Sequence, residues 1–523
     1  MRPKKILFYG EGSLLTTGYG VYARNLLTHL HKTGKYEVAE IGGFVRTDDP
    51  RIKEFPWRVF PNCPADPALQ EQFHARPTNQ WGEFVCDGVC LQYKPDIVLS
   101  IRDWWNDEYL LLSPARPYFN FIHMAQVDSA PQRPQWLHSF AQIDKVLTYT
   151  DWGLDVLRKE GQGNINLIKA AGSGVDIEHF KQQNKSACRD ALCIEDDRFI
   201  ILTVMRNQTR KLFPDLFKTF RQFLEQAPSP IAAKSYLYVH SRQPDISWNF
   251  NELIQEHGIG HRTLFSYVCH ACRAVFSSLY RGTRCTCTAC GQEKAEMPGV
   301  LNGVSPNVLS LIYNSADAYV QYSVSEGFGM SMPEAAACGV PVFAVDYSAM
   351  TDVVRKLNGF PIRVERMFRE QNVGADRAYP NNQDLLNKLV WYSRLPTEMR
   401  LKYQNLAKKG VADHYTWEKV SSVWEEVIDA TGYGYWDRPM NIHAIPNTPP
   451  PNCSNEDFIR WGFEQVASRP NLIRTRFFDE MLSDLNNGFC ESNKQPFDRE
   501  KAFAILAGWG EMKNNFEKQR CGD

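Results

Sequence analysis

Short apolar runs recur along the chain, and stretches with apolar residues at helical spacing separate many of them. The runs lie at 5–10, 36–44, 96–101, 118–123 and 145–149, and again at 198–204, 235–240 and 263–268. Continuous apolar runs of this length are typical of strands in parallel sheets that helices cover on both faces. Strand, loop and helix in alternation form the repeating unit of a doubly wound sheet. The pattern therefore predicts an α/β protein.

The length of the chain and its polar interruptions divide this pattern into domains. At 523 residues the chain is too long for one hydrophobic core. A polar segment near residue 185 predicts a linker, with one Rossmann-like domain over 1–185 and a second over 196–415. The proline-rich segment 433–454 indicates a tether, and 455–523 is expected to form a helical extension.

The most informative stretch is 324–345, with the sequence VSEGFGMSMPEAAACGVPVFAV. Gly327 and Gly329 let the backbone turn sharply and approach a ligand closely. Ser331 and Glu334 have the spacing of a capping box, so we expect a helix to begin there. The N-terminus of a helix suits phosphate, because its free N–H groups and its dipole attract anions. The stretch predicts a loop at a strand end, a short helix and a second buried strand.

Two further loops at predicted strand ends carry groups suited to phosphate. Gly18 and Gly20 lie where the first loop enters a helix, a position from which backbone amides can meet a diphosphate. Most glycine pairs at such junctions only form turns. Arg206 and Lys211 follow the run at 198–204 and precede a helix with one apolar face. Two cations at a strand end suit a diphosphate leaving group, because they neutralise developing negative charge.

Bulk composition narrows the class of protein. Hydrophobic residues make up 43% and charged residues 23% of the chain, which is ordinary for a soluble globular protein. The formal net charge of -1 gives no global attraction to nucleic acid or to anionic membranes. No window approaches the roughly 20 apolar residues of a membrane span, and the N-terminal apolar run is too short for a signal peptide. These features favour a cytoplasmic protein without a transmembrane segment.

Fourteen cysteines, five of them between positions 269 and 290, indicate a metal site in a reduced compartment. Two C-x2-C pairs with fourteen residues between them have the spacing of a zinc ribbon, which we place at 268–298. The expected ligands are Cys269, Cys272, Cys287 and Cys290. Cys285 replaces Cys287 if the second pair is wound differently, and His270 is a weaker alternative ligand. Four thiolates leave no open coordination position, so we expect a structural Zn²⁺.

The motif E-G-F-G-x-x-x-x-E-A-x-x-x-G-x-P-V at 326–342 resembles the E-x7-E signature of the retaining glycosyltransferases of family four. The resemblance extends over about 4–430, outside the ribbon. It implies the GT-B fold, in which two Rossmann-like doubly wound domains face a central cleft and the second domain holds most of the nucleotide-sugar donor. It also implies that a helix at 416–432 crosses back to the first domain. Gly18-Tyr19-Gly20 takes the place of the glycine pair that is usual in the first loop.

The resemblance further implies roles for single residues. Arg206 and Lys211 match the pair that grips the donor diphosphate, so no catalytic metal is expected. Glu326 would contact the donor sugar, and Glu334 would bind the ribose hydroxyls unless the capping box occupies its carboxylate. His123, at a predicted strand end, matches a histidine beside the sugar, although a lone histidine there is more often structural. The catalytic set is Glu326, His123, Arg206 and Lys211, and the donor-binding set adds Gly18, Gly20, Gly327, Phe328, Gly329 and Glu334.

The acceptor side is inferred from the loop that follows the run at 96–101. Ligands of open α/β sheets bind at the carboxyl ends of the strands, which makes Asp103, Trp104 and Trp105 candidates for acceptor contact. The tryptophans either form a stacking platform or pack the edge of the domain. Segment 48–95 is rich in proline, aromatic and charged residues, and its poor periodicity predicts irregular excursions over this side.

Three functions remain open. The favoured one is a retaining glycosyltransferase that moves a hexose or pentose from a nucleotide-diphosphate sugar to a hydroxyl of a small molecule, a glycan or a protein. The second is a transferase that glycosylates a hydroxymethylated base in DNA, with the ribbon as a nucleic-acid contact, and the near-neutral charge disfavours it. The third is a non-catalytic nucleotide-sugar-binding protein. The intact set Arg206, Lys211, Glu326 and Glu334 argues against it.

Overall fold

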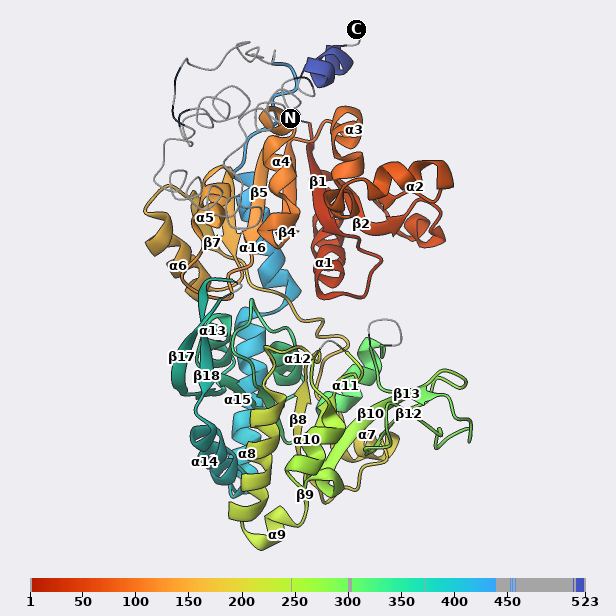
Figure 1. Ribbon diagram of the computed structural model, residues 1–523, viewed down its shortest axis with the longest axis vertical. Helices are drawn as coiled ribbons and strands as arrows, with labels where there is room; N and C mark the ends of the chain where they lie inside the picture. Colours follow the sequence, from red (N-terminus) through yellow and green to blue (C-terminus); the bar gives the residue numbers. More distant parts are fainter. Residues whose placement is uncertain are drawn as a thin grey trace.

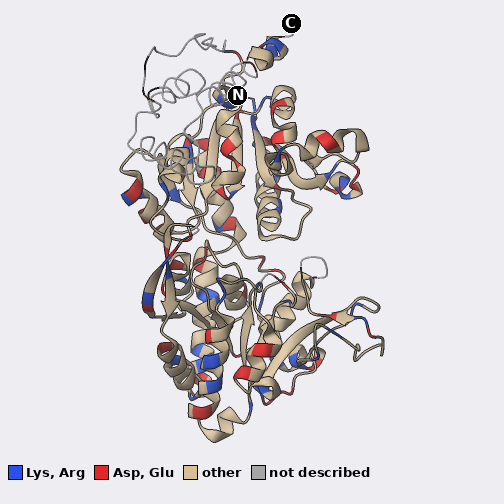
Figure 2. Ribbon diagram, viewed as in Figure 1, with Lys and Arg blue, Asp and Glu red and all other residues tan. Residues whose placement is uncertain are grey.

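The computed structural model consists of two α/β halves, each built around its own sheet (Figure 1). It describes residues 2–438 apart from 246, 300–302 and 372, together with 452, 454, 457, 511 and 514–521. Lys and Arg are interspersed with Asp and Glu over both halves (Figure 2). Within this described part, none of the helices has both the length and the apolarity needed to cross a bilayer.

The N-terminal sheet has seven parallel strands in the order β3-β2-β1-β4-β5-β6-β7. Its strands are β1 (Lys4–Glu11), β2 (Tyr36–Arg46), β3 (Arg58–Cys63), β4 (Ile97–Arg102), β5 (Asn120–Ala125), β6 (Lys145–Thr148) and β7 (Leu167–Ala170). Every residue of the central strand β4 is buried, as a strand between two helix layers must be. The strand order changes direction between β1 and β4, and a ligand crevice is expected at the carboxyl ends of these two strands.

The helices of this half cover the sheet and build its edges. They are α1 (Gly18–Lys32), α2 (Pro67–His74), α3 (Glu83–Tyr93), α4 (Glu108–Leu112), α5 (Pro134–Ala141) and α6 (Asp151–Gly161), with 3-10 turns η1 (Pro50–Glu54), η2 (Pro77–Trp81), η3 (Trp104–Asn106) and η4 (Arg116–Tyr118). The prediction of irregular structure over 48–95 is wrong, because this segment forms β3, α2 and α3. Each of these elements is short, and a proline begins α2 and also the 3-10 turns η1 and η2, so no long window of one period exists.

The C-terminal sheet has nine strands in the order β12-β13-β10-β9-β8-β14-β15-β16, with β11 also paired to β10. The strands from β10 to β16 in that order run parallel. They are β8 (Phe199–Val204), β9 (Ser235–His240), β10 (Thr263–Cys269), β14 (Ala318–Gln321), β15 (Val342–Val345) and β16 (Phe360–Ile362). The order changes direction between β8 and β14, which creates a second ligand crevice. A separate antiparallel hairpin joins β17 (Val364–Glu370) to β18 (Ala375–Pro380).

Most helices of the C-terminal half again lie between successive strands, and the last three follow the final strand. They are α7 (Lys185–Ala191), α8 (Phe213–Gln226), α9 (Ser229–Ala232), α10 (Phe250–Glu256), the 3-10 turn η5 (Gly260–Arg262), α11 (Pro306–Asn314), α12 (Ser331–Ala337), α13 (Ala349–Lys356), α14 (Asn382–Ser393), α15 (Thr397–His414) and α16 (Trp417–Asp429). Helix α8 buries Leu216, Phe217, Phe220 and Phe223 on one face, which is the apolar face that its spacing predicts.

The segment with the C-x2-C pairs extends one edge of this sheet (Figure 1). It contains β11 (Val275–Leu279), β12 (Arg284–Cys285) and β13 (Ala295–Glu296). Strands β11 and β13 both pair antiparallel with β10, and β12 pairs antiparallel with β13. The segment is therefore a continuation of the sheet and not a separate lobe.

Helix α16 returns from the C-terminal half to the N-terminal half, where it packs against α1. The indole N–H of Trp424 donates to the hydroxyl of Tyr22 at 2.8 Å. Glu425 lies 3.1 Å from Nε2 of His29. Helix α16 thus supports the first helix of the fold.

The residues after α16 pack on the N-terminal half. Trp436 stacks on Tyr118 with ring centroids 5.1 Å apart, and Phe516 lies 6.1 Å from the same ring. The described residues 514–521 therefore reach the same surface as 433–438. Most of the remaining tether, predicted at 433–454, and almost all of the predicted extension, 455–523, lie outside the described residues.

Candidate functional site

A cavity of about 820 Å³ lies where the two halves meet. The N-terminal half contributes the start of α1 and the residues after β5 and β6, and the C-terminal half contributes the residues after β8, β9 and β14. Among its lining residues are Gly18, Tyr19, Gln126, Tyr149, Arg206, Arg210, Lys211, Arg242, Asp245, Glu326, Gly327, Phe328, Gly329 and Ser331. The cavity thus lies at the carboxyl ends of strands in both sheets, where ligands of such folds bind.

Two loops of the C-terminal half are joined by backbone hydrogen bonds. The N–H of Leu212 donates to the carbonyl of Tyr322 at 3.0 Å, and the N–H of Val324 donates to the carbonyl of Arg210 at 3.0 Å. The first loop follows β8 and the second follows β14, and these two strands are neighbours in the sheet. The pairing therefore holds the basic dipeptide Arg210–Lys211 against Glu326. This glutamate lies in the loop 325–330 before α12, which we call the signature loop.

The carboxylate of Glu326 is buried and fully engaged. Nη1 of Arg210 lies 2.7 Å from Oε2, and the Lys211 ammonium contacts Oε1. The side-chain amide of Gln321 donates to Oε1 at 2.7 Å. Burial alone would raise the pKa of Glu326, but the charges of Arg210 and Lys211 outweigh burial and hold the pKa at about 2. Glu326 is therefore an ionised carboxylate between two cations.

Burial also acts on Lys211, whose side chain is almost fully enclosed. It lowers the pKa of Lys211 to about 8, although the charge of Glu326 opposes part of that shift. Arg210 remains charged, because Glu326 raises its pKa further. At neutral pH the three side chains together carry a net positive charge that faces the cavity.

Arg206 lines the same cavity but does not join this cluster. Its side chain is 53% exposed, and its guanidinium lies 3.2 Å from Oδ2 of Asp245. The loop that carries Arg206 is braced by the loop after β9. There, Trp248 donates its indole N–H to the carbonyl of Lys211 at 2.8 Å, and Asn207 donates to the carbonyl of Trp248 at 2.7 Å. An exposed cation on a braced loop is well suited to bind an anion in the cavity.

The signature loop approaches the N-terminal half very closely. A Cβ atom on Gly327 would lie 1.9 Å from Oε1 of Gln126, so a side chain at this position would displace the end of the Gln126 side chain. Gly329 has a φ of 85°, in the left-handed region. Phe328 is buried, with its ring centroid 5.7 Å from that of Tyr149. The two glycines therefore permit both the turn of the loop and its contact across the boundary between the halves.

The predicted capping box at Ser331 and Glu334 is wrong. Helix α12 begins at Ser331, so Met330 holds the N-cap position and makes no side-chain capping bond. Glu334 instead accepts a hydrogen bond from the hydroxyl of Tyr313 at 2.8 Å. Burial raises the pKa of Glu334 to about 7, and the bond from Tyr313 offsets only part of this effect. Ser331 lines the cavity, whereas Glu334 is not one of its lining residues.

The two glycines of the first loop have different surroundings. Gly18 lines the cavity, and a Cβ atom there would lie 3.3 Å from the sulfur of Met330 in the signature loop. Gly20 lies in the first turn of α1, where its N–H donates to Oγ1 of Thr17 at 3.2 Å. A Cβ atom on Gly20 would lie 2.7 Å from the carbonyl oxygen of Leu15. The structure brings Gly18 to the cavity, while the packing of the helix start accounts for Gly20.

The structure does not bring His123 to the cavity. The prediction that His123 lies at the end of its strand is wrong, because β5 continues to Ala125. The imidazole is buried within the N-terminal half, with Nδ1 3.3 Å from Oδ2 of Asp107 and 3.4 Å from Oγ of Ser100. Its ring stacks on Phe140 of α5 at 5.9 Å. The side chain therefore belongs to the packing between the sheet and its helices.

Gln126 and Arg210 are cavity residues that the sequence reasoning missed. Gln126 is the first residue after β5, and its side-chain amide donates to the hydroxyl of Tyr19 at 2.8 Å. It occupies the position at the strand end that was expected for His123. If the end of β5 had been predicted two residues later, at 125, the next residue, Gln126, would have been the candidate. The position of Arg210 directly before Lys211 was the signal for Arg210.

The segment 103–105 is not part of the cavity lining. Its two tryptophans, Trp104 and Trp105, form an aromatic cluster with Trp136. The ring of Trp104 lies 6.0 Å from that of Trp105 and 5.9 Å from that of Trp136. Trp105 is 43% exposed. Burial, and then the nearby charge of Asp128, raise the pKa of Asp103 to about 7. Trp104 thus packs the domain edge, while the ring of Trp105 is open to solvent.

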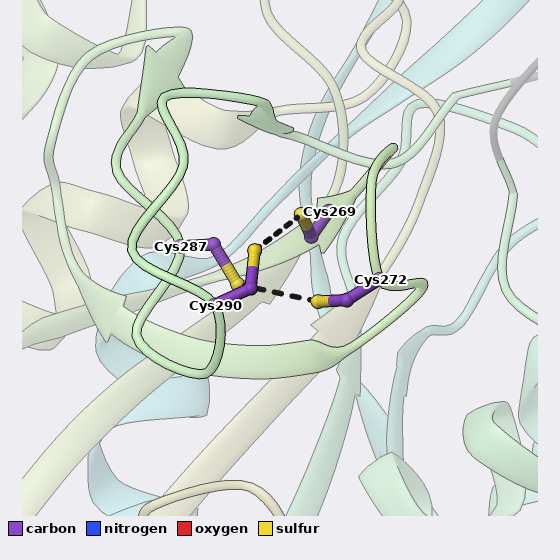
Figure 3. Close-up of side chains that lie close together, drawn as sticks. All are labelled: Cys269, Cys272, Cys287 and Cys290. Carbon is purple, nitrogen blue, oxygen red and sulfur yellow. Dashed lines mark hydrogen bonds between the residues drawn. The ribbon is translucent and has the colours of Figure 1, made fainter.

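Four cysteine sulfurs converge at the end of β10 (Figure 3). They belong to Cys269, Cys272, Cys287 and Cys290, and all lie within 4.8 Å of one another. The Cys269–Cys290 and Cys272–Cys287 sulfur distances are both 3.7 Å. Tetrahedral zinc with Zn–S bonds of about 2.3 Å holds its sulfurs about 3.8 Å apart. Two of the sulfur pairs have this separation and the other pairs lie within 4.8 Å, so the four side chains can bind Zn²⁺ after small adjustments, and the separation is far from the ~2.05 Å of a disulfide.

The alternative ligands lie outside this cluster. Cys285 is buried in β12, in register with Ala295 of β13. Nε2 of His270 lies 3.4 Å from Glu296. The N–H of Ala289 donates to Sγ of Cys287 at 3.4 Å, a contact within the turn of the second C-x2-C pair. Between Cys285 and Cys287, the structure places Cys287 in the cluster.

The sequence and the structure were compared with known proteins. Residues 292–366, which include Glu326 and Glu334, match the family described as "Glycosyl transferases group 1". No curated protein matches the chain by sequence. Among solved structures, the sucrose-phosphate synthase of Thermosynechococcus elongatus is similar with a TM-score of 0.57 and 16% identity, over 82% of this chain and 100% of that chain. The chain has the GT-B fold.

Two further GT-B proteins support this architecture. A glycosyltransferase from Rickettsia africae has a TM-score of 0.55 and 13% identity, over 82% of this chain and 99% of that chain. HepE of Anabaena, in complex with UDP-glucose, has a TM-score of 0.54 and 14% identity, with the same coverage. Because the identities are this low, the similarities establish only the architecture. This GT-B architecture is the one that the resemblance at 326–342 implied.

Proposed function

We propose that the protein is a retaining glycosyltransferase, which moves a sugar from a nucleotide-diphosphate sugar to an acceptor hydroxyl. One observation carries this proposal: Arg210, Lys211 and Glu326 form a buried cluster beside the half-exposed Arg206, in a cavity that both halves line. The family match over 292–366 supports glycosyl transfer as the reaction. UDP-glucose is bound in the similar protein HepE, and UDP-sugars are therefore the first donors to test.

Arg206 and Lys211 would bind the donor diphosphate. Negative charge develops on the diphosphate as the glycosidic bond breaks, and cations that are already in place stabilise this charge with little reorganisation. An ammonium group has three N–H donors, so Lys211 can keep its contact with Glu326 and also donate to a phosphate oxygen. These cations supply the charge that stabilises the leaving group, and the proposal requires no catalytic metal.

Glu326 would hold the transferred sugar rather than attack it. Its two oxygens already accept from Lys211, Gln321 and Arg210, and a carboxylate with a pKa of about 2 is a weak nucleophile. In the same-face reaction that we propose, the acceptor oxygen forms a bond to the anomeric carbon while the bond to the diphosphate oxygen breaks. The acceptor proton passes to the departing phosphate oxygen, and the anomeric configuration is retained.

The remaining donor contacts would come from the signature loop and the start of α1. Gly18, Gly327, Phe328 and Gly329 all line the cavity and bring the backbone close to a ligand. Glu334 makes no capping bond. Its carboxylate can therefore accept hydrogen bonds from the ribose hydroxyls, if these replace the hydrogen bond that it accepts from Tyr313. We assign Glu334 this role on the basis of the signature.

The acceptor would enter from the N-terminal half. Asp103, Trp104 and Trp105 lie at the carboxyl end of β4, next to the switch point of that sheet. The exposed ring of Trp105 offers a stacking surface for a sugar ring or another flat group. Mixed charges over both halves (Figure 2) give no reason to favour DNA with a hydroxymethylated base as the acceptor. A steep salt dependence of duplex binding would reverse this preference.

The four-cysteine cluster would hold one structural Zn²⁺ ion. Four thiolates complete the tetrahedral shell, so the ion stabilises the local fold and has no open position for a substrate. Purified protein is expected to contain about one zinc per chain, and a Cys272→Ser variant is expected to lose it. Metal analysis of both proteins is the measurement, and a folded wild-type protein without metal would remove this assignment.

The donor site is tested by a panel of nucleotide-sugars. We expect one class of donor to raise the thermal unfolding midpoint and then to release its nucleoside diphosphate in the presence of an acceptor. A Lys211→Ala variant should lose about 10²-fold or more of this turnover. Lys218→Ala, an exposed lysine on α8, is the matched control and should keep it. Equal rates in both variants would contradict the site, and NMR of the product anomer tests retention.

A further inference from the structure

The zinc-ribbon-like segment leads directly into the wall of the cavity. Ala295 of β13 is in register with Cys269, and the N–H of His270 donates to the carbonyl of Lys294 at 2.8 Å. Only three residues after Ala295, Pro298 lines the cavity, and Gly299 follows it. Strand β13, which lies beside the cysteine cluster, thus reaches the wall of the cavity within only two residues of backbone.

Arg242 joins this wall to the loop after β9. Its Nη1 donates to the carbonyl of Met297 at 3.3 Å. A Cβ atom on Gly299 would lie 2.4 Å from Cδ of Arg242, so the glycine packs directly on the arginine side chain. Asn207, which lies on the same loop as Arg206, donates to the carbonyl of Arg242 at 3.2 Å. Residues 297–299 therefore pack on Arg242, whereas Arg206 and Lys211 lie on the neighbouring loop after β8.

Strand β13 is held by its pairing with β10 and by the burial of Met297, but the turns that carry Cys272, Cys287 and Cys290 have fewer contacts. Strands β12 and β13 contain two residues each, which is too short for independent stability. Cys272 is exposed, and the second C-x2-C pair is tied mainly to its own turn, where the N–H of Cys287 donates to the carbonyl of Gln292 at 2.8 Å. A metal that binds four thiolates contributes its binding free energy to the folding of such a segment.

We propose that the metal at Cys269, Cys272, Cys287 and Cys290 fixes the wall at 297–299, and that nucleoside recognition in the cavity therefore depends on a metal that touches no substrate. This inference rests on the proposed function, which identifies the ligand of the cavity. Arg206 and Lys211 are assigned to the diphosphate and Glu326 to the sugar. The part of the cavity that Arg242 and Gly299 line is left for the base of the donor nucleoside.

Two ligands distinguish this role from a general loss of fold. UDP, ADP and GDP are first titrated into the wild-type protein, and the one that binds becomes the nucleotide probe. Inorganic pyrophosphate is the second probe, because it reaches only the cations. In a Cys272→Ser variant we expect the affinity for the nucleotide to fall at least tenfold and the affinity for pyrophosphate to change less than twofold. Cys193→Ser, an exposed cysteine outside the cluster, is the matched control.

A second arm starts from the folded wild-type protein. Zinc is removed with a chelator and then restored, and both titrations are repeated at each stage. The proposal is supported if nucleotide affinity falls and recovers with the metal while pyrophosphate affinity stays constant. It is overturned if the affinities for both ligands fall together, or if the affinity for the nucleotide does not change when the metal is removed. A wild-type protein that binds neither probe would refute the proposed function itself, and this inference with it.

Discussion

At the scale of single residues, the site depends on one buried carboxylate that neutralises part of a cationic pair. Glu326 binds Arg210 and Lys211 at the same time, through different oxygens. A buried pair that loses one partner leaves an uncompensated charge behind. The anion that best replaces the lost charge is a diphosphate, because its oxygens can accept from both cations.

The first prediction concerns Glu326. A Glu326→Gln variant keeps the shape of the side chain but removes its charge, so the cations gain attraction for a diphosphate. We expect the turnover rate to fall about 10²-fold or more while the affinity for the nucleoside diphosphate is kept or increases. Steady-state kinetics and calorimetry measure the two quantities. Glu256→Gln, an exposed position on α10, should change neither, and a parallel loss of turnover and affinity in Glu326→Gln would count against the assignment.

The second prediction concerns the pH dependence of Lys211. Burial lowers its pKa to about 8 in the free protein, so the ammonium is charged below pH 8 and loses its proton as the pH rises through that value. Below pH 8, where Lys211 stays charged, Lys211 should therefore cause no loss of affinity for a nucleoside diphosphate. Above it, the affinity should fall by up to about tenfold per pH unit. In a Lys211→Arg variant the side chain stays charged, and the decline should disappear. A decline that persists in this variant would assign the titration to another group.

At the scale of elements, the β17–β18 hairpin connects the two halves beside the cavity. Arg377 of β18 lies 2.8 Å from Asp128, which follows β5, and 2.6 Å from Glu370 of β17. The N–H of Asp376 donates to the carbonyl of Ala130 at 2.8 Å. The hairpin is therefore placed to stabilise the arrangement in which both halves line the cavity.

The third prediction tests this connection. Asp128→Asn and Arg377→Gln should each lower kcat/KM for the donor, and the double variant should lose less than the sum, with a coupling free energy of about 0.5–3 kcal/mol. Arg366→Gln, on the same hairpin but stacked on Tyr379 within it, is the control and should have little effect. Strictly additive losses would show that the ion pair does not couple the halves.

At the scale of the whole molecule, the cavity needs both halves, because the start of α1 and the residue after β5 face the signature loop. We predict that a bound nucleotide-sugar protects amides at 126–130 of the N-terminal half as well as at 206–211 and 326–331. At a ligand concentration of 100 times Kd, the added stability is about 2.7 kcal/mol. Hydrogen exchange measured by mass spectrometry checks the pattern. Protection confined to the C-terminal half would mean that the halves act separately.

The sequence by itself determined the features that depend on a few neighbouring residues. Apolar runs predicted the strands, and the two C-x2-C pairs predicted the four cysteines that converge, because local spacing and backbone geometry decide both. The E-x7-E stretch predicted a loop, a helix and a strand for the same reason. Helix starts and strand ends were less secure, and the capping box and the end of β5 were wrong by a residue or two.

Only the tertiary structure decided which distant side chains meet. Arg210 reaches Glu326 because the loops after β8 and β14 are hydrogen-bonded to each other, and Glu334 meets Tyr313 instead of capping its own helix. Gln126 rather than His123 reaches the cavity, because β5 continues past the histidine. A sequence encodes such contacts through the ends of its strands and the packing of its halves. A shift of two residues at one strand end is enough to exchange the side chain that faces the ligand.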